Sequence, residues 1–250
     1  MRNVAALVLA AGKGTRMYSD LAKVLQPICG RPMLSYVLAA LEELRLGQVL
    51  VVVGHQADSI QEIFAEASVE WVLQNEQLGT GHAVLCALPH LADFAGSVLI
   101  CCGDTPLLTV ETLRRFLTAH VNSGKDLSVL SMLLEKPGSY GRIVRNSVGE
   151  VSGIVEAKDA TGKESHIREV NTGIYCVDGA LLHDVIPGIS NANAQGEYYL
   201  TDMIQLAADR GWRVQAVTGS NVTEFMGVNT KEELEIAERI ISLRLSQTGK

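Results

Sequence analysis

The sequence lacks the patterns that mark several common classes of protein. It has no C-x-x-C or H-x-x-x-H spacing, so a structural zinc site has no support. Its five cysteines are odd in number and lie mostly within apolar runs, which argues against a disulfide framework and indicates reduced thiols. No apolar run is long enough to span a membrane, and glycines interrupt the N-terminal apolar segment too early for a signal peptide. We therefore expect a cytoplasmic protein with no membrane partner.

An excess of positive charge is also missing. The 250 residues include 21 Lys and Arg against 28 Asp and Glu, a formal net charge of −7, which argues against nucleic acid as the main partner. Any anionic ligand must then be met by a local group of cations. The chain contains no low-complexity tract, clear linker or repeat of solenoid length, and its length suits one compact catalytic unit.

What the sequence does contain is an alternation of strand-like and helix-like segments. This alternation predicts parallel strands joined by helices. The expected fold class is α/β: a Rossmann-like, mixed and mostly parallel sheet flanked by helices, with a ligand crevice at the carboxyl ends of the strands. Strands are predicted at residues 4–9, 49–53, 98–102, 127–134 and 212–217, and helices from Pro32 to a stop at Gly47 and at 58–67, 81–91, 110–121 and 198–209.

After Glu135 the pattern changes to shorter strands separated by turns. These strands predict a small antiparallel extension of the sheet, suited to form one wall of a substrate pocket. The last helix is amphipathic and is expected to begin near residue 230, with Asn229 or Thr230 as its cap.

The segment LAAGKGTRMYSDLAKVL, residues 9–25, places small residues and cations directly after the first predicted strand. It is not a P-loop, because Lys13 precedes Gly14 instead of following it, and this spacing disfavours a P-loop kinase. It also matches the dinucleotide fingerprint weakly, because the third glycine is missing. Small residues let backbone N–H groups approach a phosphate, and Lys13, Arg16 and Lys23 supply charge. In this context an anion site is favoured over a surface turn with solvated cations.

Two further positions offer oxygen ligands. Asp104 follows an apolar strand at the same edge of the sheet as the loop above, which makes it a candidate Mg²⁺ ligand, because Mg²⁺ takes few protein oxygens plus substrate phosphates. A turn or helix cap is the alternative role for this aspartate. Asn229, in the segment MGVNT, is either an oxygen ligand or a helix cap.

Polar groups suited to a base and a sugar follow other predicted strands. In LQNEQLGTGHA, Gln74 and a glycine-rich turn can form the donor and acceptor edge that a nucleobase requires, unless the glycines serve geometry only. Gly141, Glu156 and Asn171 end or interrupt short strands, and their donors and acceptors suit sugar hydroxyls. The alternative for Glu156 is a solvated surface pair with Lys158.

In order and spacing, these motifs resemble the uridylyltransferase domain of bacterial N-acetylglucosamine-1-phosphate uridylyltransferase. The resemblance covers nearly the whole chain and rests on LAAGKGTRMYSDLAKVL, EQLGTGHA, CGDTPLL, YGRIV, GIVEAKDAT, NTGIY, NAQGEYYLTD and GVN. It implies a nucleotidyltransferase domain at residues 1–229 and, at 230–250, a helix that in the family leads to a left-handed β-helix acetyltransferase domain. The implied reaction is Mg²⁺-dependent attack of N-acetylglucosamine 1-phosphate on the α-phosphorus of UTP, giving UDP-N-acetylglucosamine and pyrophosphate for cell-wall precursors.

The resemblance also implies roles for individual residues. Asp104 and Asn229 are the implied Mg²⁺ ligands, and Arg16 and Lys23 the catalytic cations that neutralise charge on the triphosphate. Nucleotide contacts are implied at Leu9, Ala10, Ala11, Gly12, Gly14, Thr15, Gln74, Gly79 and Thr80, and sugar contacts at Gly103, Gly141, Glu156 and Asn171.

The sequence departs from the family pattern at two positions. Ala22 stands where the family has proline, so the loop lacks a fixed φ, and we expect weaker ordering of the empty loop but the same reaction. Cys102 stands where a bulkier or hydroxylic residue is usual beside the sugar contacts. The given sequence ends at Lys250, before the family's β-helix, which fits either a truncated chain or a single-function form. Without the β-helix we expect a monomer or weak dimer.

Two alternative functions stay open at this level. The chain could be a nucleotidyltransferase for CTP, dTTP or another sugar phosphate, because the Gln74 amide can present either edge to a base. It could instead be a non-catalytic nucleotide- or sugar-binding module. Such a module has no need of both candidate metal ligands together with Arg16 and Lys23.

Overall fold

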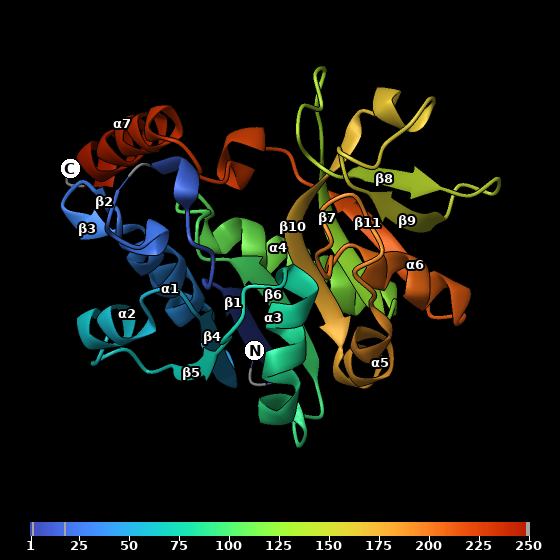
Figure 1. Cartoon of the computed structure of the whole chain (residues 1–250), viewed down its shortest axis with the longest axis horizontal. Helices are drawn as coiled ribbons and strands as arrows, with labels where there is room; N and C mark the ends of the chain where they lie inside the picture. The colour runs from blue at the N-terminus through green and yellow to red at the C-terminus, as the bar shows by residue number, and fades with distance from the viewer. Residues whose placement is uncertain (2, 18, 249–250) are drawn as a thin grey trace.

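The computed structural model describes residues 1, 3–17 and 19–248 of the chain. Within them a nine-stranded mixed sheet lies between two layers of helices (Figure 1). Its strands are β1 (Val4–Leu9), β4 (Gln48–Val53), β5 (Glu70–Leu73), β6 (Ser97–Cys102), β7 (Leu127–Leu133), β8 (Arg142–Arg145), β9 (Val151–Val155), β10 (Glu169–Asp178) and β11 (Val214–Thr218). The order along the main path is β11-β7-β10-β6-β1-β4-β5, and β8 and β9 extend the sheet beside β10.

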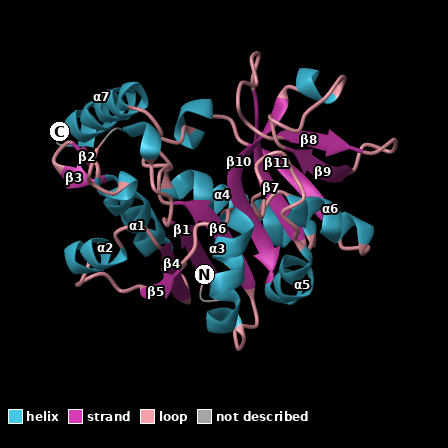
Figure 2. Ribbon diagram, viewed as in Figure 1, coloured by secondary structure: helices cyan, strands magenta, loops and turns pink. Residues whose placement is uncertain are grey.

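Helices cover both faces of this sheet, as Figure 2 shows. In the described residues the α-helices are α1 (Met33–Leu44), α2 (Ala57–Ile63), α3 (Thr80–Ala87), α4 (Val110–Ser123), α5 (Gly179–Val185), α6 (Asp202–Asp209) and α7 (Lys231–Thr248). α3, α5 and α6 pack on one face, and α1, α2 and α4 pack on the other. α7 lies against the short strand pair β2 (Pro27–Ile28) and β3 (Arg31–Pro32).

The directions of strand pairing place the ends of the central strands together. β1 runs parallel to β4 and β6, with Leu9 opposite Val52 in one neighbour and Cys102 in the other. β10 runs antiparallel to β6 and β7, and β8 and β9 form an antiparallel pair. The predicted α/β class, with a mixed sheet and a small antiparallel extension, is confirmed. Because parallel strands end at one edge, the segments after β1, β4 and β6 leave the sheet side by side.

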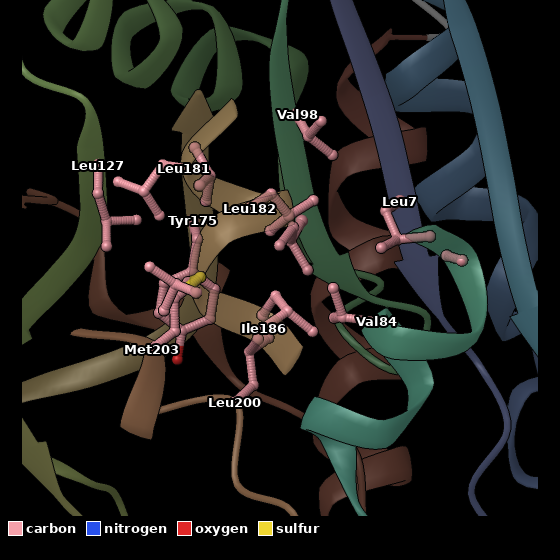
Figure 3. Packing of buried hydrophobic residues seen from close by; sticks show 14 of the residues in the cluster. Leu7, Val84, Val98, Leu127, Tyr175, Leu181, Leu182, Ile186, Leu200 and Met203 are labelled. Atoms are coloured by element: carbon pink, nitrogen blue, oxygen red, sulfur yellow. The ribbon is translucent and has the colours of Figure 1, made fainter. Parts of the chain in front are cut away.

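The central strand β1 is apolar along its whole length because both faces of the sheet are buried there. In β1, Ala5 and Leu7 point into the core formed with α3, α5 and α6, whereas Ala6 and Val8 point into the opposite core. Figure 3 shows the first core from close by, where side chains of the sheet meet those of α3, α5 and α6. These two cores fix the strands that carry the segments described below.

Most predicted strands and helices are present, with shifted ends where the backbone has another partner. The strands predicted at 4–9, 49–53, 98–102 and 127–134 are β1, β4, β6 and β7, with ends within about one residue. α1 ends before Gly47 because Arg45 already takes a left-handed φ of 52°. α6 begins at Asp202, not at Tyr198, because the Tyr198 carbonyl oxygen accepts from the Gly81 N–H at 2.7 Å and not from a following turn of helix. β5, α5 and the β2–β3 pair were not predicted.

α7 begins at the predicted place and Thr230 is its cap. The Glu233 N–H donates to Thr230 Oγ1 at 3.2 Å, and Glu233 Oε2 accepts from the N–H groups of Thr230 and Asn229 at 3.0 and 2.6 Å. This reciprocal arrangement is a capping box. Ala237 and Ile241 of α7 are buried in a third apolar cluster. Neither α7 nor any other helix in the described residues has the length and apolar character needed to cross a membrane.

Candidate active site

Two cavities open where β1 and β6 end, and both are lined by Cys102 and Asp104. The first, of about 370 Å³, is called the loop cavity and is lined chiefly by residues 9–13, Lys23, Gln74, Gly79 and Thr80. The second, of about 400 Å³, is called the extension cavity and is lined chiefly by Arg16, Tyr140, Gly141, Glu156, Asn171 and Asn229. Most residues predicted to contact a nucleotide therefore line one cavity, and most predicted to contact a sugar line the other.

Lys23 connects the two predicted metal ligands. Its ammonium donates to Asp104 Oδ2 and to Asn229 Oδ1, the latter at an N···O distance of 2.7 Å. Arg16 Nη2 donates to the same Asn229 oxygen at 3.0 Å. The structure thus brings two cations and two candidate ligands to the junction of the cavities, although the four residues come from three distant parts of the chain.

Gly14 allows the loop after β1 to approach Lys23 closely. Its φ is +61°, and a Cβ at this position would lie 2.5 Å from Lys23 Cβ. The Met17 N–H donates to the Gly14 carbonyl oxygen at 2.9 Å and closes the 3₁₀ turn η1 (Thr15–Met17), which carries Arg16. Thr15 begins this turn, and its side chain lies outside the described part of the chain.

The Gln74 amide has a defined set of partners beside the loop cavity. Gln74 is 3% exposed, and its Nε2 donates to the Gly79 carbonyl oxygen at 3.1 Å and lies 3.0 Å from His82 Nδ1. His82 Nε2 lies 3.8 Å from Cys86 Sγ. With the imidazole proton on Nε2, Nδ1 accepts from Gln74 and both amide hydrogens are used. Gln74 Oε1 is then the edge that can accept from a ligand.

The turn before α3 is held by the NAQGEYYLTD segment. Gly79 has a φ of +117°, and a Cβ there would lie 2.6 Å from the Tyr198 carbonyl oxygen, so only glycine fits. The same carbonyl accepts from the Gly81 N–H at 2.7 Å, and Thr80 Oγ1 accepts from the Leu200 N–H at 3.1 Å. The two glycines therefore serve geometry, and the turn presents Gly79 and Thr80 to the loop cavity.

Asn171 is placed in the extension cavity by an irregular stretch of β10. The register with β7 shifts between Asn171 and Ile174, and Gly173 in this stretch has a φ of +80°. Asn171 Oδ1 accepts from the Gly173 N–H at 2.9 Å, and Asn171 Nδ2 donates to the Tyr175 hydroxyl at 2.7 Å. A bulge of this kind re-aims a side chain at a sheet edge. Asn171 is therefore held by bonds on both ends of its amide.

Glu156 also lines the extension cavity. Its Oε1 accepts from the Thr201 hydroxyl at 3.1 Å. Burial raises the pKa of the Glu156 carboxyl, and the hydrogen bond from Thr201 opposes that rise. A Cβ on Gly141 would lie 3.4 Å from Glu156 Oε1. Lys158, the alternative partner of Glu156, donates to Gln195 instead.

Gly103, predicted as a sugar contact, lies in the packing between β1 and α1. Its N–H donates to the Leu9 carbonyl oxygen at 2.9 Å, and a Cβ there would lie 3.2 Å from the side chains of Ala10 and Leu34. The preceding Cys102 lines both cavities. Burial, together with the nearby Asp104, raises the pKa of the Cys102 thiol, which keeps it neutral.

Several lining residues were not predicted. Tyr140, Thr172 and Glu233 line the extension cavity, and Tyr140 directly precedes the predicted Gly141. His82 and Thr201 lie within the motifs that carried the resemblance, yet their partners are not sequence neighbours. The sequence motifs identified the segments that carry these residues, whereas the hydrogen-bond partner of each side chain depends on the tertiary fold.

Comparisons with known proteins agree with this geometry. Residues 6–164 match the model of the MobA-like NTP transferase domain family. The chain is 48% identical over 248 residues to the bifunctional protein GlmU of Pelobacter propionicus, covering 99% of this chain and 54% of that protein. It is 50% identical over 243 residues to the bifunctional protein GlmU of Trichlorobacter lovleyi, covering 97% of this chain and 53% of that protein. The chain thus spans about half the length of these curated relatives.

A solved structure shares the fold. The crystal structure of HddC from Yersinia pseudotuberculosis complexed with GMP-PN aligns with a TM-score of 0.70 over 95% of this chain and 99% of that chain. At 18% sequence identity this similarity concerns the fold alone. The relatives confirm the resemblance inferred from the ordered motifs, and the family model spans most of the sheet and the loop after β1. The chain belongs to the family of MobA-like NTP transferase domains.

Proposed function

We propose that this chain transfers a uridylyl group from UTP to N-acetylglucosamine 1-phosphate, giving UDP-N-acetylglucosamine and pyrophosphate. The observation that carries the proposal is the junction of the two cavities at Asp104, where Lys23 bonds both Asp104 and Asn229. Nucleotidyl transfer needs two anionic substrates to meet at one electropositive point, and this junction supplies such a point. The relatives called bifunctional protein GlmU support the same choice of product.

The loop cavity suits the nucleoside triphosphate. After Leu9, one wall of this cavity consists of the small residues Ala10, Ala11 and Gly12. Small side chains allow a ligand to come close to the main-chain N–H groups. Lys13 and Lys23 line the same cavity, and Arg16, which lines the extension cavity, donates to the Asn229 oxygen that Lys23 also bonds. These cations would meet the phosphates and neutralise charge as pyrophosphate leaves.

The orientation of Gln74 supports uracil as the base. Uracil offers an N3–H donor between two carbonyl oxygens, whereas N3 of cytosine is an acceptor. With both Gln74 amide hydrogens used by Gly79 and His82, Gln74 Oε1 can accept from the N3–H of uracil. The same oxygen would face an unpaired acceptor on cytosine, which costs binding energy. The base preference therefore follows from two bonds within the protein.

The extension cavity suits the sugar phosphate. Glu156 and the Asn171 amide offer acceptors and donors there, and the Gly141 backbone lies beside them. Sugar hydroxyls need both kinds of partner. Because this cavity and the loop cavity share Asp104, a phosphate on the sugar would lie close to the α-phosphate of the nucleotide.

Asp104 and Asn229 fit a Mg²⁺ ion. Their side-chain oxygens converge on a single cationic group, the Lys23 ammonium, which is the arrangement that a cation site requires. Mg²⁺ takes one or two protein oxygens and completes its shell with phosphates and water. When bound by Asp104 and Asn229, the ion would supply charge neutralisation between the two anionic substrates.

The remaining chemistry needs no covalent enzyme intermediate. A phosphate oxygen of the sugar phosphate forms a bond to the α-phosphorus of UTP, and the bond from that phosphorus to pyrophosphate breaks. The attacking phosphate is already ionised near neutral pH, so no general base is required. Arg16 and Lys23 orient the triphosphate and stabilise the charge that develops on the leaving pyrophosphate.

The test is pyrophosphate release from purified protein with Mg²⁺, UTP and N-acetylglucosamine 1-phosphate. Parallel reactions replace UTP by CTP or dTTP, and replace the sugar by glucosamine 1-phosphate or glucose 1-phosphate. Release that requires both UTP and the acetylated sugar supports the proposal. Faster release with CTP, dTTP or another sugar points to a different nucleotidyltransferase, and UTP binding without release in any reaction points to a binding module.

Two further expectations stay predictions. We propose that residues 1–229 form the nucleotidyltransferase domain and that 230–250 form a C-terminal helix. We also expect a monomer or weak dimer, which sedimentation velocity over a concentration series would measure.

A further inference from the structure

Gln56 bonds the backbone immediately before Lys23. Gln56 lies in the turn between β4 and α2, and its Oε1 accepts from the Ala22 N–H at an N···O distance of 2.6 Å. Its Nε2 donates to the Asp20 carbonyl oxygen. Ala22 is 2% exposed, so its backbone lies within the protein and not in solvent. One side chain therefore bonds the backbone at two positions, Asp20 and Ala22, of the segment that leads into Lys23.

The same turn also bonds the opposite end of the loop. The His55 N–H donates to the Ala11 carbonyl oxygen at 3.4 Å. Ala11 and Ala22 thus mark the two ends of a loop that carries Lys13 and Arg16, and both ends are bonded to residues 55–56. Because β4 is paired with β1 on one side and β5 on the other, the turn that follows it is anchored to the sheet. Loss of one bond would free one end of the loop only.

Ala22 has a backbone conformation that proline would also adopt. Its φ is −50° and its ψ is 140°, within the range that a pyrrolidine ring imposes. Alanine has no covalent restriction to this φ, and it keeps an N–H that proline lacks. The Gln56 side chain uses that N–H. A hydrogen bond from a neighbouring element therefore takes the place of a ring constraint.

Gln56 itself adopts an uncommon conformation to make these bonds. Its φ is 56° and its ψ is 37°, in the left-handed region that non-glycine residues seldom occupy. Such a residue persists only where surrounding contacts hold it. The hydrogen bonds of Gln56 to the Ala22 N–H and the Asp20 carbonyl oxygen are contacts of this kind. The segment before Lys23 therefore holds Gln56 in its left-handed conformation.

We propose that Gln56 is a positioning residue, which acts through Ala22 to place the Lys23 ammonium at the junction of the two cavities. The inference rests on the proposed function, since Lys23 is taken to bind the triphosphate. Its contribution should appear in triphosphate binding and turnover, and not in binding of the nucleoside, because Gln74 and Thr80 lie on a different turn.

The experiment compares Gln56→Ala with Gln61→Ala, a matched control on α2. For Gln56→Ala we expect kcat for pyrophosphate release to fall about tenfold. This loss lies between the effect of losing one hydrogen bond and the roughly 100-fold loss in rate that a 1 Å misplacement of a reacting group causes. The Kd for UTP, measured by calorimetry, should weaken by a similar factor while the Kd for uridine stays unchanged. Gln61→Ala should match the parent chain in all three quantities, and thermal melts confirm that each variant is folded.

A second substitution separates positioning from a general loss of stability. Ala22→Pro in the Gln56→Ala background should restore kcat, because proline imposes the φ that Ala22 already has and Gln56 no longer occupies the space beside the nitrogen. Ala22→Pro alone should lower kcat, because the proline ring carbon replaces the hydrogen that faces Gln56 Oε1 at 2.6 Å. The same substitution is thus expected to have opposite effects in the two backgrounds.

Two outcomes would overturn the inference. One is equal kcat and UTP affinity in folded Gln56→Ala and Gln61→Ala. The other is a folded double variant that stays as impaired as Gln56→Ala, which would indicate a structural role only. If the parent chain binds UTP but releases no pyrophosphate, the proposed function fails, and the UTP and uridine affinities still test Gln56.

Discussion

The Lys23 ammonium lies 2.7 Å from Asn229 Oδ1, although 206 positions separate the two residues in the chain. The same ammonium donates to Asp104, at the end of β6. Asn229 is held in turn by Glu233 Oε2, which accepts from the Asn229 N–H in the first turn of α7. One cation therefore joins the loop after β1, the end of β6 and the start of the last helix.

Removal of either partner at this junction should abolish most turnover without unfolding the chain. Lys23→Ala removes a charge that faces the triphosphate, and Asp104→Ala removes a candidate metal ligand. We expect each to lower kcat by about 100-fold or more. Pyrophosphate release measures the effect, circular dichroism confirms folding, and Lys136→Ala on the exposed surface is the control. Near-normal turnover of both folded variants would show that the junction is not catalytic.

Gly14→Ala should impair activity more than its backbone strain explains. Gly14 and Gly124 both have a φ of +61°, but a Cβ on Gly14 would meet Lys23 at 2.5 Å, whereas a Cβ on Gly124 meets nothing within 4 Å. The left-handed φ should cost each variant about 1 kcal/mol of stability, and the contact with Lys23 adds to this cost in Gly14→Ala alone. Only Gly14→Ala should also lower kcat, because it displaces Lys23. Equal kcat in the two variants, measured beside urea unfolding, would contradict this account.

His82→Leu should weaken discrimination between UTP and CTP. His82 Nδ1 lies 3.0 Å from Gln74 Nε2, and its loss frees the amide to turn its donor edge toward the base. We expect the ratio of kcat/KM for UTP to that for CTP to fall by about tenfold, the equivalent of roughly 1.4 kcal/mol. His166→Ala, on an exposed turn, is the control. An unchanged ratio in a folded His82→Leu protein would mean that another group orients Gln74.

Glu156→Gln should change the pH dependence of stability. Burial raises the pKa of the native Glu156 carboxyl, so the unfolded chain, with an ordinary value of about 4.3, releases this proton first as pH rises. The parent chain therefore loses stability from about pH 4.3 upward, until the raised native pKa is passed. The glutamine variant keeps an acceptor for Thr201 and avoids this loss.

Urea unfolding of both proteins between pH 4 and pH 8 measures the difference. The stability of Glu156→Gln relative to the parent should increase with pH across the acidic range and then level off. Glu66→Gln, at an exposed position, is the control for loss of a carboxylate. A constant difference for Glu156→Gln would mean that the native carboxyl titrates as it does in the unfolded chain.

Much of the local structure follows from short patterns in the sequence. The unbroken apolar runs at β1, β4, β6 and β7 predicted buried strands, because a strand covered on both faces needs apolar side chains on both. The amphipathic pattern of the last segment predicted a helix that starts near residue 230, and Thr230 is its cap. β5 and α5 escaped prediction because they are short, at 4 and 7 residues, and short segments carry little periodicity.

Local periodicity in the sequence predicted most of the strands and helices, and it also marked the segments that carry polar groups at strand ends. Only the tertiary structure decided that Lys23 bonds Asn229, that His82 orients Gln74 and that Gln56 bonds Ala22. The Lys23–Asn229 and Gln56–Ala22 pairs depend on strand order, which places β1 between β4 and β6 and brings their ends together, whereas His82 and Gln74 meet across the turn between β5 and α3. That order is set by the packing of both cores at once, and no local pattern in the sequence encodes it.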